Sequence, residues 1–264
     1  MDNGLLVTGS IAYAKEALIG KWTRWLIFII CGLPFALLPF AFDTKKMADA
    51  ATFSWDMVPW GTLAALFLAG LLLSFFTSGY LARIYRGVNT PPEFDNWGVL
   101  FVDGIKLAIV GFLWFLPMAV VGVGILLVIF SGLATGSMVP SGLAIGLVIF
   151  LLIVEGIVAV IAIIYSMMGV VRCARTGSIR EGIRFSALTT TLRSIGWTQY
   201  IIALIVLLVL SFVFFLVTSI FTIIPPLGAA VQLILTPLFT VFAARYVTRV
   251  YEHGLPPSAA TENP

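Results

Sequence analysis

Long apolar runs separated by short polar stretches dominate the sequence. A helix needs about 20 mostly apolar residues to cross the hydrocarbon core of a bilayer. The pattern predicts an all-α protein, a polytopic membrane helical bundle of six spans that form three hairpins. It also predicts a single domain over residues 1–254 and a disordered tail over residues 255–264. The six apolar runs cover residues 23–42, 61–82, 105–131, 142–169, 198–220 and 224–246.

Composition places most of the chain in lipid. Hydrophobic residues make up 61% of the 264 residues and charged residues only 10%. A soluble domain usually has about 45–50% apolar and about 25% charged residues. Because a water-soluble fold of this size could not bury the excess, lipid must surround most of the helices. Aromatic rings at or near the span ends, where they favour the headgroup layer, are Trp22, Trp25, Trp60, Trp97, Trp197, Tyr200 and Tyr246.

Basic residues set the predicted orientation. With an even number of spans both chain ends lie on one side, and 13 of the 15 basic residues fall on that side. Only Lys45 and Lys46 fall on the other. By the positive-inside rule the basic side is cytoplasmic, so we expect a multi-pass protein of the cell membrane with cytoplasmic N and C termini. The basic excess follows from this topology and gives no reason to expect a nucleic-acid partner.

A basic pattern recurs at the end of each even-numbered span. Two arginines and then a glycine follow the second, fourth and sixth runs, and a short amphipathic stretch precedes the first, third and fifth. We interpret this as a threefold repeat of hairpins, each preceded by an interfacial amphipathic helix on the cytoplasmic face; chance likeness among hydrophobic hairpins is the alternative. The candidate lipid-headgroup contacts of this basic face are Arg83, Arg86, Arg172, Arg175, Arg184, Arg193, Arg245 and Arg249.

The amphipathic stretches carry recognisable helix signals. The first is predicted to start near Ser10, and Asp95 is placed to cap the second. Before the fifth run, Ser178 and Glu181 have the S-x-x-E spacing of a capping box. The apolar stripe that follows predicts a helix lying in the membrane interface, or alternatively a lid packed under the bundle. Its members are Phe185, Leu188, Leu192 and Ile195.

No constellation of residues favours an enzyme. The single histidine, His253, lies beyond the last span, and motifs for nucleotide, zinc or serine-hydrolase chemistry are absent. Cys31 and Cys173 lie at different depths, which argues against a disulfide between them. We expect no catalytic residue and no cofactor.

Three carboxylates gather around one loop. Glu93, Asp95 and Asp103 could hold a hard cation. Helix capping and pairing with the nearby Arg83, Arg86 and Lys106 is the favoured interpretation, so we expect no metal site.

The same region resembles a known family. The run starts at Gly79-Tyr80, passes Arg83 and Arg86, continues as Pro92-Glu93-Phe94-Asp95-Asn96-Trp97 and ends at Asp103-Gly104. It resembles a prokaryotic, largely archaeal, membrane-protein family known as domain of unknown function 4013, although Asn96 stands where the family pattern has a second Asp. The resemblance spans roughly residues 10–250 and implies a multi-span membrane protein. It implies no activity and no catalytic residue, because the family has no established biochemistry.

Glu155 is the only acidic residue inside a predicted span. It lies 17 residues before Arg172, about 25 Å along a helix and hence near the bilayer centre. An ionised carboxylate there costs roughly 2.5–3.5 kcal/mol, so the side chain must stay protonated or face a polar partner. We predict that Glu155 points into the bundle and is hydrogen-bonded to Gln232 or Ser211. A neutral carboxyl that fixes helix register is favoured over a proton- or ion-carrying role.

Two classes of function fit these patterns. The first is a non-catalytic membrane protein that organises the bilayer, interacts with lipid or scaffolds partners through its basic face. The second is a small-solute or ion transporter or channel that uses Glu155, since transporters often arise from duplicated hairpins. The first is favoured because the spans carry few polar residues to line a path. Its expected partners are the bilayer, including anionic lipids, and a homo-oligomer or another membrane protein.

Overall fold

Six long apolar helices form the framework of the protein. The computed structural model describes residues 2–42, 54–134 and 142–255, and within them it contains helices and no strands. Six helices are long and apolar enough to cross a membrane, which confirms the predicted polytopic all-α bundle. These are α2 (Trp22–Leu37) with the turn η1 (Leu38–Ala41), α4 (Trp60–Tyr85), α5 (Trp97–Ala134), α6 (Gly142–Thr176), α9 (Trp197–Ser219) with η3 (Ile220–Ile223), and α10 (Pro225–Glu252).

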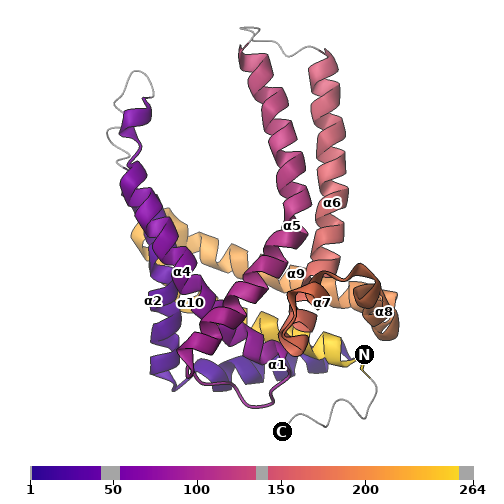
Figure 1. The fold of residues 1–264 in the computed structure, drawn as a ribbon. Helices are drawn as coiled ribbons and strands as arrows, with labels where there is room; N and C mark the ends of the chain where they lie inside the picture. Colours follow the sequence, from indigo (N-terminus) through magenta and orange to yellow (C-terminus); the bar gives the residue numbers. More distant parts are fainter. Residues whose placement is uncertain (1, 43–53, 135–141, 256–264) are drawn as a thin grey trace.

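Four further helices in the described residues cross no membrane, and all but one of them gather at one end of this framework (Figure 1). They are η2 (Trp55–Met57), α1 (Asn3–Leu18), α7 (Ile179–Ile183) and α8 (Phe185–Ile195). Apart from η2, they lie around the span ends that carry Arg24, Arg83, Arg172 and Arg245, which we call the basic end; the opposite ends form the far end. In Figure 1 the α5–α6 hairpin stands away from the rest, while α1, α7 and α8 lie near its foot.

The buried core lies at the basic end. The side chains of Tyr80 in α4, Leu100 in α5, Met168 in α6 and Tyr246 in α10 are all almost completely buried there. Towards the far end the hairpins diverge (Figure 1), and none of the most apolar window of α5 is buried. The far halves of the spans therefore present their apolar side chains to the surroundings, as a membrane helix does to lipid.

Two glycines let α4 and α5 cross closely near the basic end. A Cβ atom on Gly79 would lie 1.9 Å from the Leu100 carbonyl oxygen, and one on Gly104 would lie 1.8 Å from that of Phe75. Small residues at such crossings allow helix backbones to touch. The crossing fixes the position of the loop that joins the two helices.

The first two amphipathic stretches differ from prediction. Helix α1 begins at Asn3, well before Ser10, because the Asp2 carboxylate caps the backbone N–H groups of Gly4 and Leu5 at 2.8 and 3.2 Å. The second stretch is no separate helix, since α5 runs unbroken from Trp97 to Ala134. The carboxylate of its predicted cap, Asp95, instead accepts a hydrogen bond from Arg83.

The third stretch forms two helices that break at Arg184. The predicted capping box is not made: the Ser178 side chain caps no backbone group, and Glu181 pairs with Arg172 and Arg184. The apolar side of α8 packs into the protein core as a lid under the bundle, the alternative to interfacial burial. The stripe residues buried there are Leu188, Leu192 and Ile195.

Candidate functional site

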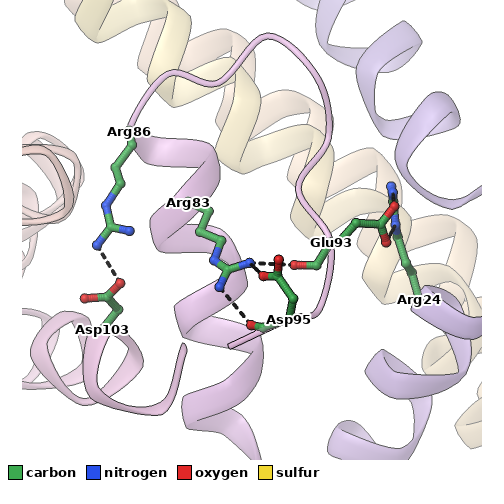
Figure 2. Close-up of polar contacts among 6 residues, drawn as sticks. All are labelled: Arg24, Arg83, Arg86, Glu93, Asp95 and Asp103. Atoms are coloured by element: carbon green, nitrogen blue, oxygen red, sulfur yellow. Dashed lines mark hydrogen bonds and ion pairs between the residues drawn. The ribbon is translucent and has the colours of Figure 1, made fainter. Parts of the chain in front are cut away.

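Arg83, in the last turn of α4, holds the α4–α5 loop by three contacts. Its guanidinium pairs with the Asp95 carboxylate and donates to the carbonyl oxygens of Glu93 and Asp95 at 2.7 and 2.8 Å. Figure 2 shows these contacts, with the loop curving from Arg86 over to Glu93. One cation thus satisfies two backbone carbonyls that no secondary structure would satisfy.

Arg24 ties the same loop to the start of α2. Its Nε donates to Glu93 Oε2 at 2.9 Å, its Nη2 pairs with Glu93 Oε1, and its Nη1 donates to the Ala17 carbonyl at 3.2 Å. The Arg24 side chain is almost completely buried, whereas that of Glu93 is 65% exposed. The hydrogen bond from Arg24 holds the pKa of the Glu93 carboxyl below its ordinary value. This fork-like pairing joins α1, α2 and the loop.

Arg86 and Arg175 connect α4 reciprocally with α6. Arg86 Nε donates to the Ala174 carbonyl at 3.1 Å and its Nη2 pairs with Asp103, while Arg175 Nε donates to the Tyr85 carbonyl at 3.0 Å. Asp103 is buried within α5, so this pairing neutralises a carboxylate in an apolar setting. The crossed contacts fix the ends of three spans to one another.

Glu252, at the end of α10, completes that connection. It accepts from Arg175 Nη2 at 2.7 Å, and the Arg175 guanidinium lies 5.0 Å from the Tyr251 ring centre. Gly87 has a φ of +92°, and a Cβ there would lie 2.6 Å from Glu252 Oε1. The backbone angle therefore favours glycine after the arginine pair, and a Cβ there would also displace the Glu252 carboxylate.

Arg245 of α10 supports the loop from the other side. It is 4% exposed, donates to the Val88 carbonyl at 3.0 Å and to Asn89 Oδ1 at 3.2 Å, and lies 4.8 Å from the Tyr13 ring centre. It therefore links α10, the loop and α1. We call Arg24, Arg83, Arg86, Arg175 and Arg245, with their carboxylate and carbonyl partners, the arginine network.

An aromatic cluster lies beside this network and gives the aromatic residues of the motif a packing role. The Tyr80 and Phe94 rings stack at 4.5 Å, Phe28 meets both edge-on at 5.2 and 5.3 Å, and Phe94 stacks on Trp97 at 5.9 Å. Such pairs add about 0.5–1.5 kcal/mol each beyond their buried area. Phe28, which sequence reasoning missed, carries no motif signal because it lies in an ordinary apolar run.

The motif residues thus form a joint between helices. Gly79 and Gly104 form the crossing, Tyr80, Phe94 and Trp97 fill it, and the acidic residues anchor the loop to arginines. The last group consists of Glu93, Asp95 and Asp103. Each of these three carboxylates pairs with a different arginine: Asp95 with Arg83 and Asp103 with Arg86, as predicted, and Glu93 with Arg24, which was not predicted. In the part of the chain that the structure describes, no three His, Cys, Asp or Glu side chains group closely enough to hold a metal ion.

The other predicted basic residues differ in exposure. Arg172 donates to Glu181 Oε2 at 3.0 and 2.6 Å and is partly buried, whereas the Arg184 side chain is 59% exposed and meets Glu181 Oε1 at 3.2 Å. Arg249 makes one long hydrogen bond, 3.4 Å, to the Leu5 carbonyl and packs its guanidinium against Gly9 of α1, and Arg193 is exposed in the last turn of α8. Glu181 as a shared partner was missed because its spacing suggested a cap.

The predicted polar cluster inside the membrane is not formed. Glu155 lies on the α5–α6 hairpin, and its Oε2 atom is buried without a hydrogen-bond partner among the described residues. The Ser211 hydroxyl donates to the Leu207 carbonyl of its own helix at 2.8 Å, and Gln232 lies in a different groove. The prediction of a bond from Glu155 to Gln232 or Ser211 is wrong, because the α5–α6 hairpin stands away from the helices that carry those residues (Figure 1).

Gln232 lines a groove between α2, α4 and α10. The groove has a volume of about 380 Å³ and is open on one side. Most of its wall is apolar, but one side carries Gln232, Thr236 and Thr240 at helical spacing, facing Ser74 and Thr77 of α4. Pro237 has no backbone N–H, so the Leu233 carbonyl lacks the helical hydrogen bond that it would otherwise accept. The groove has hydrogen-bonding capacity, and no acidic or basic residue lines it.

Comparison with known proteins gives a family and no activity. A family described as a protein of unknown function, DUF4013, matches residues 62–223, more than half of the chain. No curated protein and no solved structure matches the sequence. The matched range contains the α4–α5 joint, including the glycine crossing, the acidic loop and all of the aromatic cluster except Phe28. On the match over residues 62–223, this multi-pass membrane protein belongs to the DUF4013 family.

Proposed function

We propose that the protein is a non-catalytic membrane organiser, in which a rigid basic end holds three hairpins at fixed angles within the bilayer. The observation that carries this proposal is the distribution of burial. The core and the arginine network lie at the basic end, while the far halves of the spans diverge with exposed apolar side chains. Lipid or other membrane chains must cover these surfaces, so the molecule imposes an arrangement on its surroundings.

The charge at the basic end supports a cytoplasmic, lipid-facing position. Basic side chains near anionic headgroups each contribute about 1 kcal/mol of attraction. Arg180, Arg184 and Arg193 are exposed on α7 and α8, and lipid contact is proposed for them rather than for the network arginines. We place both termini on the cytoplasmic side of the cell membrane, and propose anionic lipid and a membrane partner or second copy as interacting species.

A solute or ion transporter remains the second candidate. Its support is the buried, unpartnered Oε2 of Glu155 and the polar wall of the α2–α4–α10 groove. The two features lie on different hairpins, however, so they do not form one path. A polar route across a bilayer needs charged or polar residues that share a cavity, which makes this the weaker proposal.

Reconstitution separates the two functions. Purified protein in vesicles is expected to alter vesicle shape and lipid lateral mobility, measured by cryo-electron microscopy and by fluorescence recovery. Ion or solute flux is expected to stay at the level of protein-free vesicles. Glu155→Gln serves as the matched variant and is expected to leave the effect on the bilayer unchanged. Unaltered vesicles together with a flux that Glu155→Gln abolishes would favour the transporter instead.

A further inference from the structure

An open polar hollow lies between the end of α6 and α8. It has a volume of about 380 Å³, within the usual range of small-ligand sites. Its wall is more polar than that of the α2–α4–α10 groove. Figure 1 shows α7 and α8 side by side with the foot of α6, where the hollow is formed. Its lining residues are Arg172, Arg184, Ser186, Ala187, Thr190, Thr191 and Ser194.

The charge around the hollow is positive after pairing. Residues 172–195 contain five arginines and one acidic residue, Glu181. Arg175 is neutralised by Glu252, and Glu181 is shared between Arg172 and Arg184. One guanidinium of the hollow is therefore in excess, and two more arginines of α7 and α8 lie nearby in sequence. An anion entering the hollow would replace water around an incompletely paired cation.

Arg184 has the donors that such an anion needs. A guanidinium carries five N–H groups, and one Nη1 contact, to Glu181 at 3.2 Å, is made in the described part of the chain. The hydroxyls of Thr190, Thr191 and Ser194 donate to carbonyls of α8 at 3.0, 3.1 and 2.8 Å. Their oxygen lone pairs can still accept. The hollow thus offers cationic donors beside neutral acceptors, which suits a phosphate ester that carries hydroxyl groups.

The border of the hollow favours a lipid as the source of that phosphate. Ile183 and Phe185, on either side of Arg184, are 39% and 54% exposed, and the Phe185 ring stacks on Tyr165 of α6 at 4.3 Å. An exposed cation between exposed apolar side chains is typical of a membrane interface, where the charge meets headgroups and the apolar groups meet acyl chains. A free phosphate would leave both apolar side chains unused.

We propose that the hollow between α6 and α8 binds the phosphate of an anionic glycerophospholipid, with Arg184 as its principal donor. The site deepens the proposed membrane-organising function, and rests on it only for the position of this end at the headgroup layer. It makes lipid contact local and selective, where the basic face alone would attract anionic lipid diffusely.

Two charge-matched variants test the site. Arg184→Gln and Arg193→Gln each remove one exposed cation from α8 or its N-terminal junction, but only Arg184 lines the hollow. Phosphatidylglycerol and phosphatidylcholine retained by the purified protein are counted by native mass spectrometry. Arg184→Gln is expected to lower phosphatidylglycerol affinity about tenfold, the loss of one charge-assisted contact. Detergent micelles have no charged bilayer surface to give the diffuse attraction of about 1 kcal/mol per basic residue, so Arg193→Gln is expected to change this affinity less than about twofold. Equal losses in both variants would overturn the proposal, since they indicate diffuse attraction.

A third variant and a second ligand complete the test. Ala187→Phe fills the hollow without changing charge, so it is expected to lower phosphatidylglycerol retention like Arg184→Gln. Thermal melting checks that each variant folds. Inorganic phosphate, added as competitor, is expected to displace little lipid; if it stabilises the protein as well as phosphatidylglycerol does and no lipid is retained, the lipid assignment is wrong. Lost lipid retention with an unchanged vesicle effect would separate this site from the broader function.

Discussion

At the residue scale, the glycines of the α4–α5 crossing are the least replaceable positions. A methyl group on Gly104 would overlap the Phe75 carbonyl. Gly111, seven residues further along α5, has open space around it. We expect Gly104→Ala to cost about 1–3 kcal/mol through overpacking. Gly111→Ala should cost nothing and could gain up to about 1 kcal/mol from helix propensity. Unfolding in mixed micelles measures both; equal stability of the two variants would contradict the close crossing.

Asn96 is held in a backbone conformation that few residues adopt. It has a φ of +48°, the left-handed region in which Asn is enriched among non-glycine residues. We expect Asn96→Ala to cost about 1 kcal/mol, while Asn96→Asp, whose short polar side chain also tolerates this region, stays close to the unmodified protein. Melting temperatures of the two variants provide the measurement. An alanine variant as stable as the aspartate variant would show that the loop relaxes at this point.

The Glu93 carboxylate predicts a pH dependence. Its pKa is lowered from 4.5 by the hydrogen bond from Arg24, so the folded state favours the ionised form. The pair therefore contributes stability above pH 4.5, and this contribution is lost as the pH falls through the lowered pKa. Because Glu93 is 65% exposed, the contribution is less than about 1 kcal/mol. Melting from pH 7 to pH 3 should show the unmodified protein losing its advantage over Glu93→Gln in that acidic range; a constant difference would exclude the pair as its cause.

At the element scale, α1 depends on α10 through Arg245. Removing this buried guanidinium leaves the Val88 carbonyl and Asn89 without their donor and Tyr13 without its cation. Arg245→Met keeps the apolar stem, so we expect a loss of about 2 kcal/mol or more and faster hydrogen exchange in α1 and residues 87–90. Arg193→Met is the control, since Arg193 is exposed in the last turn of α8. Similar exchange in both variants would contradict the dependence.

The lengths of the apolar runs were sufficient to predict the six spans, because bilayer thickness dictates them directly. The amphipathic stretches were harder to place. A polar residue such as Asp103 suggested a boundary before the third span, yet α5 continues through it because Arg86 neutralises it there. Likewise Glu181 has the spacing of a helix cap, but its carboxylate accepts from Arg172, which lies on another helix. These pairings depend on which helix ends lie together in the fold, and the hydrophobic periodicity within one apolar run carries no information about that.

The candidate site was predictable to a similar extent. The acidic loop and its arginines were identified from their charge and proximity in sequence, and Arg83 and Arg86 pair as expected. The Glu155 cluster failed because depth along a helix says nothing about the angle between hairpins. Depth measured from the nearest arginine placed Glu155 and Gln232 at comparable levels, but the α5–α6 hairpin stands away from the other spans, so equal depth does not bring the two side chains together (Figure 1).

At the scale of the whole molecule, the network extends beyond the region that defines the family. Arg24 and Arg245, which hold the α4–α5 loop from two sides, lie outside residues 62–223. The first and last spans therefore stabilise the joint on which the matched region is built. Because these contacts all lie at the basic end, the molecule is fixed there and divergent at the far end, a shape that suits interaction with lipid or partners between the hairpins.

Orientation of this shape in the membrane is the final prediction. The positive-inside rule counts Lys and Arg, and acidic neighbours contribute little to it, so pairing within the network does not weaken the expected cytoplasmic position of the basic end. The native cysteines are buried, which leaves a low background for thiol labelling. A membrane-impermeant maleimide applied to intact cells should label Ser54→Cys, near the far end, and should label Thr90→Cys only after permeabilisation. Labelling of Thr90→Cys in intact cells would place the arginine network outside, and with it the hollow proposed to bind lipid.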